Sequence, residues 1–437
     1  MAIFDPEAEQ MGREELAQLQ LERLQATLHR AYKNVKFYKR RFDELGFLPE
    51  DCQSLEDLAR LPFTTRHDLA QGYPYEMFAV PLREVVRIHS STGSPGAPIV
   101  MGYTARDLRT WAKLAARALT AAGVDRDDVV QVTLSYGLLT SAFGVHYGVE
   151  LLGASVIPTG PGGSDRQVQI MRDYRTTVLV STPSYALVLA DRMEALGVEA
   201  KNLHLKVALL AGEPWTEAQR REIESRLFLK AMDHYALSEA MGAGVAAECA
   251  HRHLPGMHLS EDHFLPEVID PQSSAPLPPG ELGELVLTTL TKEASPLVRF
   301  RTGDLVRLDY APCPCGRTLA RISRIEGRSD AVVIVKGINI FPARVGQVLA
   351  GLPEIKGKEP TYQLVVGREG HLDYLEVRIE VQEGLFFDKM TVQREFLLKL
   401  SRKLEQSIAV APRVKLVEPG SISREAETSP LVIDLRK

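Results

Sequence analysis

Four short apolar runs between residues 129 and 210 are the feature that most constrains the fold. The runs cover 129–134, 155–158, 177–181 and 205–210, and they are rich in β-branched residues. Segments with helical character separate them, such as 166–174 and 185–196. Apolar strands that alternate with helices are typical of a mostly parallel sheet covered on both faces. The pattern therefore predicts an α/β fold.

The pattern changes on both sides of this region. Residues 13–33 carry apolar side chains at helical spacing, and residues 280–309 are rich in strand-forming residues. Beyond residue 327 we expect a strand (331–335), a helix (342–352), strands (362–367 and 374–381), a helix (391–408) and a last strand (414–417). About a hundred residues suffice for a separate α+β domain. We predict a large body over residues 1–328 and a small C-terminal domain over 329–437.

Composition excludes several classes of protein. Hydrophobic residues make up 45% and charged residues 25%, which excludes a disordered chain. The net charge of −5 leaves no excess of basic residues that would favour binding to nucleic acid or to an anionic membrane. Residues 129–149 lack charge, but polar side chains such as Gln131 and His146 interrupt them, which favours a buried strand and helix. Four cysteines are too few for a disulfide scaffold. With no apolar leader after Met1, we expect a cytoplasmic protein without membrane or nucleic-acid partners.

Three segments suggest contacts with a nucleotide. Residues 90–98 form a loop rich in glycine, serine and proline that could hold phosphate oxygens, although it lacks the Gly-Lys-Ser/Thr ending of a Walker A motif. Residues 233–239 place carboxylates beside hydroxyls, a combination that suits Mg²⁺. Asp304 follows a strand, where an acid can accept ribose hydroxyls. Taken singly, each segment is equally compatible with an ordinary turn.

The order of the motifs resembles the phenylacetate–coenzyme A ligase family of adenylate-forming enzymes, over nearly the whole chain. The matching segments are 73–81, 90–98, 182–186, 211–215, 234–239, 261–264, 290–294, 301–304, 327–330 and 335–342. The resemblance implies a multi-layer N-terminal body with mixed sheets and a small mobile C-terminal domain that rotates about Asp330. It also implies a two-step ligase. An aryl or arylacetic acid, the small-molecule partner, attacks the α-phosphate of ATP with Mg²⁺ as cofactor, and coenzyme A then displaces AMP to give a thioester.

The resemblance also assigns roles to individual residues. The nucleotide residues would be Ser91, Thr92, Gly93, Ser94, Gly96, Gly212, Glu213, Pro214, Asp233, Tyr235, Ser238, Glu239, Asp304 and Arg324, with Glu239 on Mg²⁺. The acyl pocket would include Tyr136, Phe143, Gly242, Ala243 and Gly244, and coenzyme A would meet Arg66 and Lys336. Members of the family often form dimers, so a homodimer is compatible with the resemblance.

One departure from the family bears directly on catalysis. The family's last motif carries a lysine that enters the site during adenylation, and an ungapped match over residues 421–434 places Thr428 there. The lysine of the phosphate loop is replaced by Ala97, and the second acid after the hinge by Ala331. Loss of one preorganised charge costs on the order of 3 kcal/mol, or about a hundredfold in rate. No catalytic residue is assigned with certainty.

Two hypotheses about activity follow from this departure. In the first hypothesis the chain is a ligase. Either another cation substitutes for the lysine, with Arg424 and Lys437 as the nearest candidates, or adenylation is impaired. Alternatively, it is a nucleotide- or acyl-coenzyme A-binding regulatory protein that has lost adenylation.

Cysteine and histidine residues suggest a metal site. Cys313 and Cys315 offer two thiolates, and Cys249 offers a third near several histidines. We favour a structural Zn²⁺ bound by Cys249, His258, Cys313 and Cys315, because a closed set of four such ligands leaves no position for a catalytic water. His251 or His253 could replace His258, and a cluster of reduced thiols without metal is the alternative.

Overall fold

The computed structural model describes residues 2–91, 98–251, 255–330, 332–352, 360–380, 390–418, 421–422 and 431–436. The chain divides between Ser329 and Asp330 into two compact units, a body and a C-terminal domain. The sequence placed this division between residues 328 and 329. The adenylate-forming type of α/β fold expected from the sequence is confirmed.

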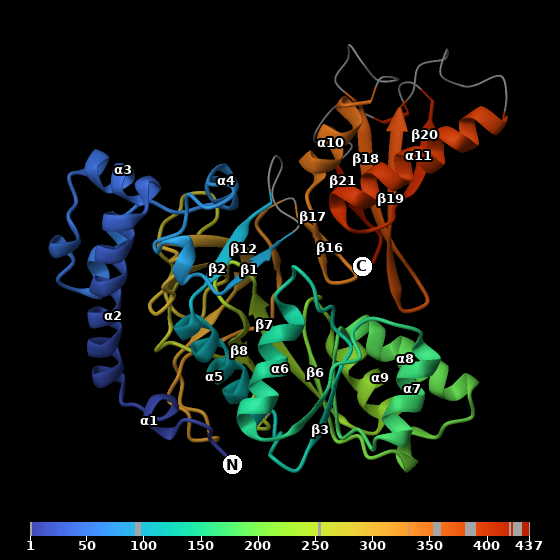
Figure 1. The fold of residues 1–437 in the computed structure, drawn as a ribbon, viewed down its shortest axis with the longest axis horizontal. Coiled ribbons are helices and arrows are strands. Elements are labelled where there is room, and N and C mark those ends of the chain that lie inside the picture. Colours follow the sequence, from blue (N-terminus) through green and yellow to red (C-terminus); the bar gives the residue numbers. More distant parts are fainter. Residues whose placement is uncertain are drawn as a thin grey trace. The chain divides into compact units, whose positions relative to one another are not determined.

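The body begins with helices that pack by their apolar stripes. They are α1 (Pro6–Glu9), α2 (Arg13–Asn34), α3 (Lys36–Leu45) and α4 (Arg66–Gln71), and α2 and α3 lie together in Figure 1. Helix α2 buries Leu16, Leu24, Leu28 and Ala31, which matches the predicted helical spacing. Short 3₁₀ turns cover Pro49–Asp51, Leu55–Arg60, Leu82–Glu84 and Ala200–Asn202.

A nine-stranded sheet forms the centre of the body, in the order β13-β14-β9-β8-β7-β6-β5-β3-β4. The parallel half comprises β3 (Val129–Val132), β4 (Ser155–Ile157), β5 (Val178–Ser181), β6 (Val207–Leu210) and β7 (Lys230–Leu237). The first four of these strands are the predicted apolar runs. At β7 the sheet changes from parallel to antiparallel pairing, because β7 pairs in parallel with β6 and antiparallel with β8.

Helices cover both faces of the parallel half, as the apolar strands predict. The helices are α5 (Ala105–Ala121), α6 (Ser141–Leu152), α7 (Ser164–Asp173), α8 (Pro183–Ala195) and α9 (Glu217–Leu227). Val178 and Val180 of β5 pack with residues of α5 and α6, whereas Leu179 packs with residues of α7, α8 and α9. Residues 129–149 thus form β3 and much of α6, and no described helix is apolar over enough length to cross a membrane.

The remaining strands of the body form the antiparallel half and two smaller sheets. The antiparallel half adds β8 (Gly242–Ala247), β9 (Met257–Leu259), β13 (Leu308–Asp309) and β14 (Arg321–Ile322). A four-stranded antiparallel sheet contains β10 (Phe264–Ile269), β11 (Gly283–Thr289), β12 (Phe300–Val306) and β15 (Gly327–Arg328). Strands β1 (Arg87–Ser90) and β2 (Val100–Tyr103) pair as a ribbon.

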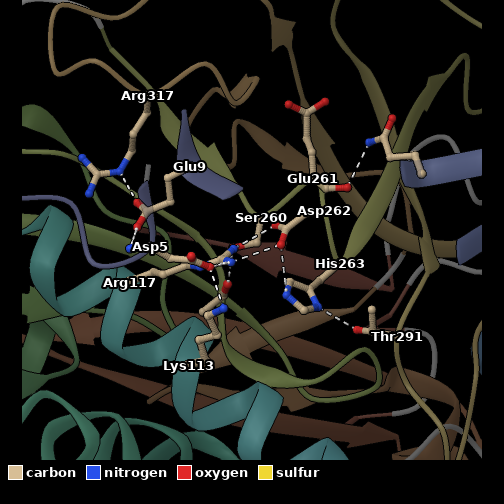
Figure 2. A network of polar contacts seen from close by, with 12 residues as sticks. Asp5, Glu9, Lys113, Arg117, Ser260, Glu261, Asp262, His263, Thr291 and Arg317 are labelled. Carbon is tan, nitrogen blue, oxygen red and sulfur yellow. Dashed lines mark hydrogen bonds and ion pairs between the residues drawn. The ribbon is translucent and has the colours of Figure 1, made fainter. Parts of the chain in front are cut away.

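A buried polar network ties the N-terminal segment to the turn between β9 and β10 (Figure 2). Arg117 of α5 donates to both carboxylate oxygens of Asp262, at 2.8 and 3.1 Å, and also contacts Asp5. Arg317 contacts Glu9 in the same region. Each buried charge therefore has an opposite partner, which is the condition under which charges are tolerated in a core.

The C-terminal domain has its own apolar core. Its elements are β16 (Val333–Val335), β17 (Ile338–Ile340), α10 (Pro342–Ala350), β18 (Tyr362–Glu369), β19 (Leu372–Glu380), α11 (Met390–Ile408), β20 (Arg413–Val417) and β21 (Val432–Asp434). The order of its larger sheet is β20-β19-β18-β21. The sequence predicted these elements except β17 and β21.

Candidate functional site

Strand β7 positions the polar residues of the candidate site. Asp233 and Tyr235 are two residues apart on β7, so their side chains emerge on the same face. Ser238 and Glu239 follow directly after the strand ends at Leu237. Strand β7 is the last strand of the parallel half, and open α/β sheets commonly bind ligands outside the carboxyl ends of their parallel strands.

Tyr235 connects β7 to the four-stranded sheet. Its hydroxyl donates to Asp304 Oδ2 on β12 at 2.6 Å, across a sequence separation of 69 residues. Arg328 of β15 holds the other oxygen of Asp304, and its Nη2 donates to the Thr302 carbonyl at 3.1 Å. Burial, followed by the negative charge of Asp304, raises the pKa of Tyr235 well above its ordinary value. The phenol therefore stays protonated and orients the carboxylate.

Glu239 lies in the same connected network. Its Oε1 accepts from Arg66 of α4, and both side chains are buried. Arg66 Nη2 also donates to the Thr302 carbonyl at 3.3 Å, so Arg66 and Arg328 share one acceptor on β12. The structure thus brings together two acids, Glu239 and Asp304, that the sequence assigned to one ligand.

Asp233 belongs to a second cluster at the same end of the sheet. Its backbone N–H donates to Glu248 Oε2 at 2.7 Å, and Arg324 Nε lies 3.5 Å from its carboxylate. Burial, together with the charge of Glu248, raises the pKa of Asp233 to about 7. The Arg324 guanidinium lies 4.8 Å from the centre of the Trp215 ring. Arg324 therefore lies beside Asp233, as both assignments to the nucleotide require.

The glycine-rich segments are described only in part. Ser91 donates its backbone N–H to the Ile99 carbonyl at 3.0 Å, whereas Thr92, Gly93, Ser94 and Gly96 lie outside the described residues. Gly212 has a positive φ of 88°, which suits glycine, and it precedes Glu213 and Pro214. Glu213 accepts from the Ser184 hydroxyl at 2.9 Å at the start of α8.

The residues expected in the acyl pocket form an aromatic wall and a tightly packed bend. Tyr136 meets Phe143 of α6 edge-on, with ring centres 5.3 Å apart. A Cβ at Gly242 would lie 2.6 Å from the Trp111 ring, and one at Gly244 would lie 2.6 Å from the backbone of Leu114. These glycines therefore let β8 pack closely against α5, and Ala243 faces the apolar core instead.

The sequence did not assign several polar partners that the structure reveals. Arg328 holds Asp304, and Thr140 hydrogen-bonds Ser238 at 2.7 Å. His234 Nε2 accepts from the Gly244 backbone N–H at 2.8 Å, and burial lowers the pKa of His234 to about 4. Arg328 could have been found from its place in the 327–330 motif, but the other two contacts have no local signal in the sequence.

Other predicted residues lie in the C-terminal domain or outside the described residues. Lys336, expected at coenzyme A, is exposed in the C-terminal domain, where it has a positive φ of 52°. Asp330 follows the division between the units, and its carboxylate accepts from the Val332 N–H at 3.3 Å. Ala97, Ala331, Arg424, Thr428 and Lys437 lie outside the described residues.

Cys249, His258, Cys313 and Cys315 converge in the body. Their four potential ligand atoms lie within 4.8 Å of one another, and all four residues are buried. Pairing of β9 with β14 brings His258 beside the cysteine segment. His251 is described but lies outside this set of ligand atoms, and His253 is not among the described residues. Of the two histidines that are described, the geometry therefore selects His258 over His251.

Two of the distances between these ligand atoms match the edges of a tetrahedral zinc site. Cys249 Sγ lies 3.8 Å from Cys313 Sγ, and Cys315 Sγ lies 3.4 Å from His258 Nε2. Zinc–sulfur and zinc–nitrogen bonds of ordinary length give tetrahedral edges of about 3.8 and about 3.5 Å. His258 Nδ1 lies 3.3 Å from the Leu319 carbonyl, a contact that directs Nε2 toward the cluster. Hydrogen bonding to Cys249 and to His258 lowers the pKa of Cys315, whereas hydrogen bonding to Cys315 raises the pKa of Cys249 and burial raises that of Cys313, so one thiolate is favoured before a metal binds.

Comparisons with known proteins give consistent results. Residues 90–290 match the family described as AMP-binding enzyme, and residues 337–436 match the AMP-binding enzyme C-terminal domain. A phenylacetate-coenzyme A ligase of Thermus thermophilus is 43% identical over 448 residues and covers 100% of both chains. A phenylacetate-coenzyme A ligase of Escherichia coli is 43% identical, over 97% of this chain and 95% of the relative.

Similarity extends to solved structures. The structure of 2-hydroxyisobutyryl-CoA ligase in complex with 2-HIB-AMP and CoA superposes with a TM-score of 0.92 and 30% sequence identity. The match covers 99% of this chain and 92% of that one.

Proposed function

Because the chain belongs to the phenylacetate–coenzyme A ligase family of AMP-binding enzymes, we propose that it activates an aryl or arylacetic acid with ATP and transfers the acyl group to coenzyme A. The observation that carries this proposal is the hydrogen bond between Tyr235 and Asp304, which joins two motifs assigned to one nucleotide. The neighbouring Glu239–Arg66 pair supports it, because Arg66 and the Asp304 partner Arg328 both donate to the Thr302 carbonyl.

The reaction brings a carboxylate toward a triphosphate, so its transition state gathers negative charge. Asp304, oriented by Tyr235 and Arg328, is placed to accept the ribose hydroxyls. Asp233 and Arg324 would flank the adenine side of the nucleotide. Arg66 supplies a buried positive charge next to Glu239. Fixed charges and dipoles of this kind lower the barrier because they need no reorganisation during the reaction.

Glu239 fits the expected magnesium ion. A carboxylate is a hard oxygen ligand of the kind Mg²⁺ prefers, and Glu239 Oε2 is the oxygen left over from the contact with Arg66. When bound there, the ion would neutralise phosphate charge.

Thr428 stands at the position of the family's adenylation lysine, and we propose that adenylation is correspondingly slow in this chain. The test is ATP–pyrophosphate exchange with a panel of aromatic acids. A Thr428→Lys variant is expected to gain about a hundredfold in exchange rate, because it restores one charge near the reacting groups. Thr428→Met, which adds length without charge, is the matched control and should gain nothing.

The second half-reaction can be measured separately. A preformed acyl adenylate and coenzyme A should give thioester in the wild-type protein, since the lysine serves adenylation alone in this scheme. If no acid supports exchange in the wild type or in Thr428→Lys, and no thioester forms from the adenylate, the ligase proposal is wrong. Retained AMP binding would then favour the regulatory alternative.

We also propose that Cys249, His258, Cys313 and Cys315 bind a structural zinc ion. The support is that the four buried ligand atoms converge and that two of their distances match tetrahedral edges; a set of four such ligands leaves no position for a reacting water. The segment after Cys315 also contacts the N-terminal segment, because Thr318 donates its backbone N–H to the Glu9 carbonyl at 3.0 Å. The ion would therefore stabilise the fold rather than take part in catalysis.

Metal analysis of the purified protein tests this proposal. We expect about one zinc ion per chain, and its loss in Cys313→Ser. Cys52→Ser is the matched control, because Cys52 is a buried free cysteine outside the cluster. Full zinc content in Cys313→Ser would exclude the proposed ligand set.

A further inference from the structure

Arg87 and His89 present two polar side chains to one aromatic ring. They are two residues apart on β1, so they share a face, while Ile88 between them is exposed. The Arg87 guanidinium lies 5.1 Å from the centre of the Phe143 ring, and the His89 ring centre lies 5.6 Å from it. Phe143 also meets Tyr136, which makes it part of the proposed acyl pocket.

Each of these side chains has one buried nitrogen atom that finds no hydrogen-bond partner in the described part of the chain. In Arg87 this atom is Nη1, while Nη2 donates to the Tyr147 hydroxyl at 2.9 Å. In His89 it is Nε2, on a side chain that is only 2% exposed. A buried polar group without a partner costs stability, so such atoms call for an explanation.

The tautomer of His89 follows from its other hydrogen bond. His89 Nδ1 lies 3.1 Å from the Leu138 carbonyl, and a carbonyl can only accept, so Nδ1 carries the proton. Burial lowers the pKa of His89 and keeps the ring neutral. Its Nε2 is therefore an acceptor, whereas Arg87 Nη1 is a donor.

A third unpartnered nitrogen in the same region has a different cause. Trp111 Nε1 is buried without a partner, but a Cβ at Gly144 would lie only 2.1 Å from it. The indole nitrogen is thus covered by the backbone of α6. The neighbours of His89 are instead aromatic: the Tyr103 and Trp111 rings meet it edge-on, with ring centres 5.5 and 5.6 Å away, and offer its Nε2 no hydrogen bond.

An acceptor and a donor beside one aromatic ring are complementary to a hydroxyl group, which can donate and accept at once. We propose that the acyl pocket selects an aromatic acid with a hydroxyl substituent on its ring, which donates to His89 Nε2 and accepts from Arg87 Nη1. This inference rests on the proposed ligase function. A carboxylate or nitro substituent would face the His89 lone pair with another acceptor. An unsubstituted ring would leave both nitrogens without a partner.

Binding of unreactive acyl-adenylate analogues tests the inference independently of Thr428. Sulfamoyl-linked adenosine analogues of phenylacetic acid and of its three monohydroxy isomers would be compared by calorimetry. We expect one hydroxylated isomer to bind at least about tenfold more tightly than the unsubstituted analogue, because sites built around a hydroxyl discriminate against ligands that lack it.

Variants assign the preference to the two side chains. His89→Phe keeps an aromatic ring without the acceptor and should abolish the preference, whereas His89→Asn keeps an acceptor and should retain part of it. Arg87→Met should also reduce the preference. Tyr147→Phe is the control, because it removes the hydroxyl that Arg87 contacts and leaves the two proposed ligand atoms in place.

The outcomes separate this inference from the function on which it rests. The inference is refuted if all four analogues bind within twofold of one another, or if His89→Phe keeps the preference. The two nitrogens would then hydrogen-bond to water rather than to the ligand, and the ligase proposal would stand. If no analogue binds, the proposed function itself fails and the inference fails with it. Tryptophan fluorescence of each variant verifies that its body is folded.

Discussion

Replacing Arg117 by methionine tests how strongly the buried polar network supports the body. Arg117 is 4% exposed and holds both oxygens of Asp262, which is 1% exposed (Figure 2). Methionine keeps much of the side-chain volume but leaves a buried carboxylate without its main partner. Removing one member of a buried ion pair costs about 3–5 kcal/mol, because the remaining charge is desolvated and uncompensated.

The expected loss lies near the lower end of this range. Asp262 retains the Arg23 guanidinium at 3.7 Å, which compensates part of its charge, and the His263 ring at 3.1 Å, which can offer a hydrogen bond although burial lowers its pKa. We therefore predict that Arg117→Met lowers the free energy of unfolding of the body by about 3 kcal/mol.

Intrinsic fluorescence in urea is the appropriate assay. The chain has two tryptophans, Trp111 and Trp215, and both lie in the body, so the signal reports unfolding of that unit. Arg192→Met is the matched control. Arg192 pairs with Asp165 at 2.7 Å in the same unit, but the two side chains are 40% and 61% exposed. The control should cost less than about 1 kcal/mol.

A double variant provides the decisive comparison. Arg117→Met combined with Asp262→Leu removes both charges and should be less destabilised than Arg117→Met alone, since no buried charge is left unpaired. If Arg117→Met and Arg192→Met shift the unfolding midpoint equally, burial does not set the strength of this ion pair and the reasoning is refuted.

Two further predictions concern the candidate site. Gly244→Ala should destabilise the body by about 2–4 kcal/mol in the same urea assay, because the new Cβ would meet the α5 backbone at a positive φ of 91°. Gly163→Ala, with nothing within 4 Å of the added Cβ, should change stability by less than about 1 kcal/mol. Burial raises the pKa of Asp233 from 3.8 to about 7. The stability that Asp233 contributes to the folded body is therefore complete below about pH 4 and is lost as pH rises through about 7. Asp233→Asn should therefore flatten the pH dependence of unfolding by at most about 4 kcal/mol over this range, and an unchanged profile would exclude Asp233 as its source.

The sequence by itself determined the elements of the fold. The apolar runs became β3, β4, β5 and β6, and the 391–408 helix became α11, because apolar periodicity is a property of neighbouring residues. The short strand β21 was missed because its three residues carry no periodic signal and are held by parallel pairing with β18. The motif series also indicated the family, since each motif keeps its own local spacing.

Only the tertiary structure decided which side chains meet. The sequence favoured His258 as the metal ligand and left His251 or His253 as replacements, and the structure brings His258, and not His251, to the three cysteines. Likewise, the structure places Arg87 and His89 two residues apart on β1, and packing against α6 leaves a donor and an acceptor beside Phe143. Spacing along the chain specifies local geometry, whereas contacts across tens of residues depend on how the sheets close around one core.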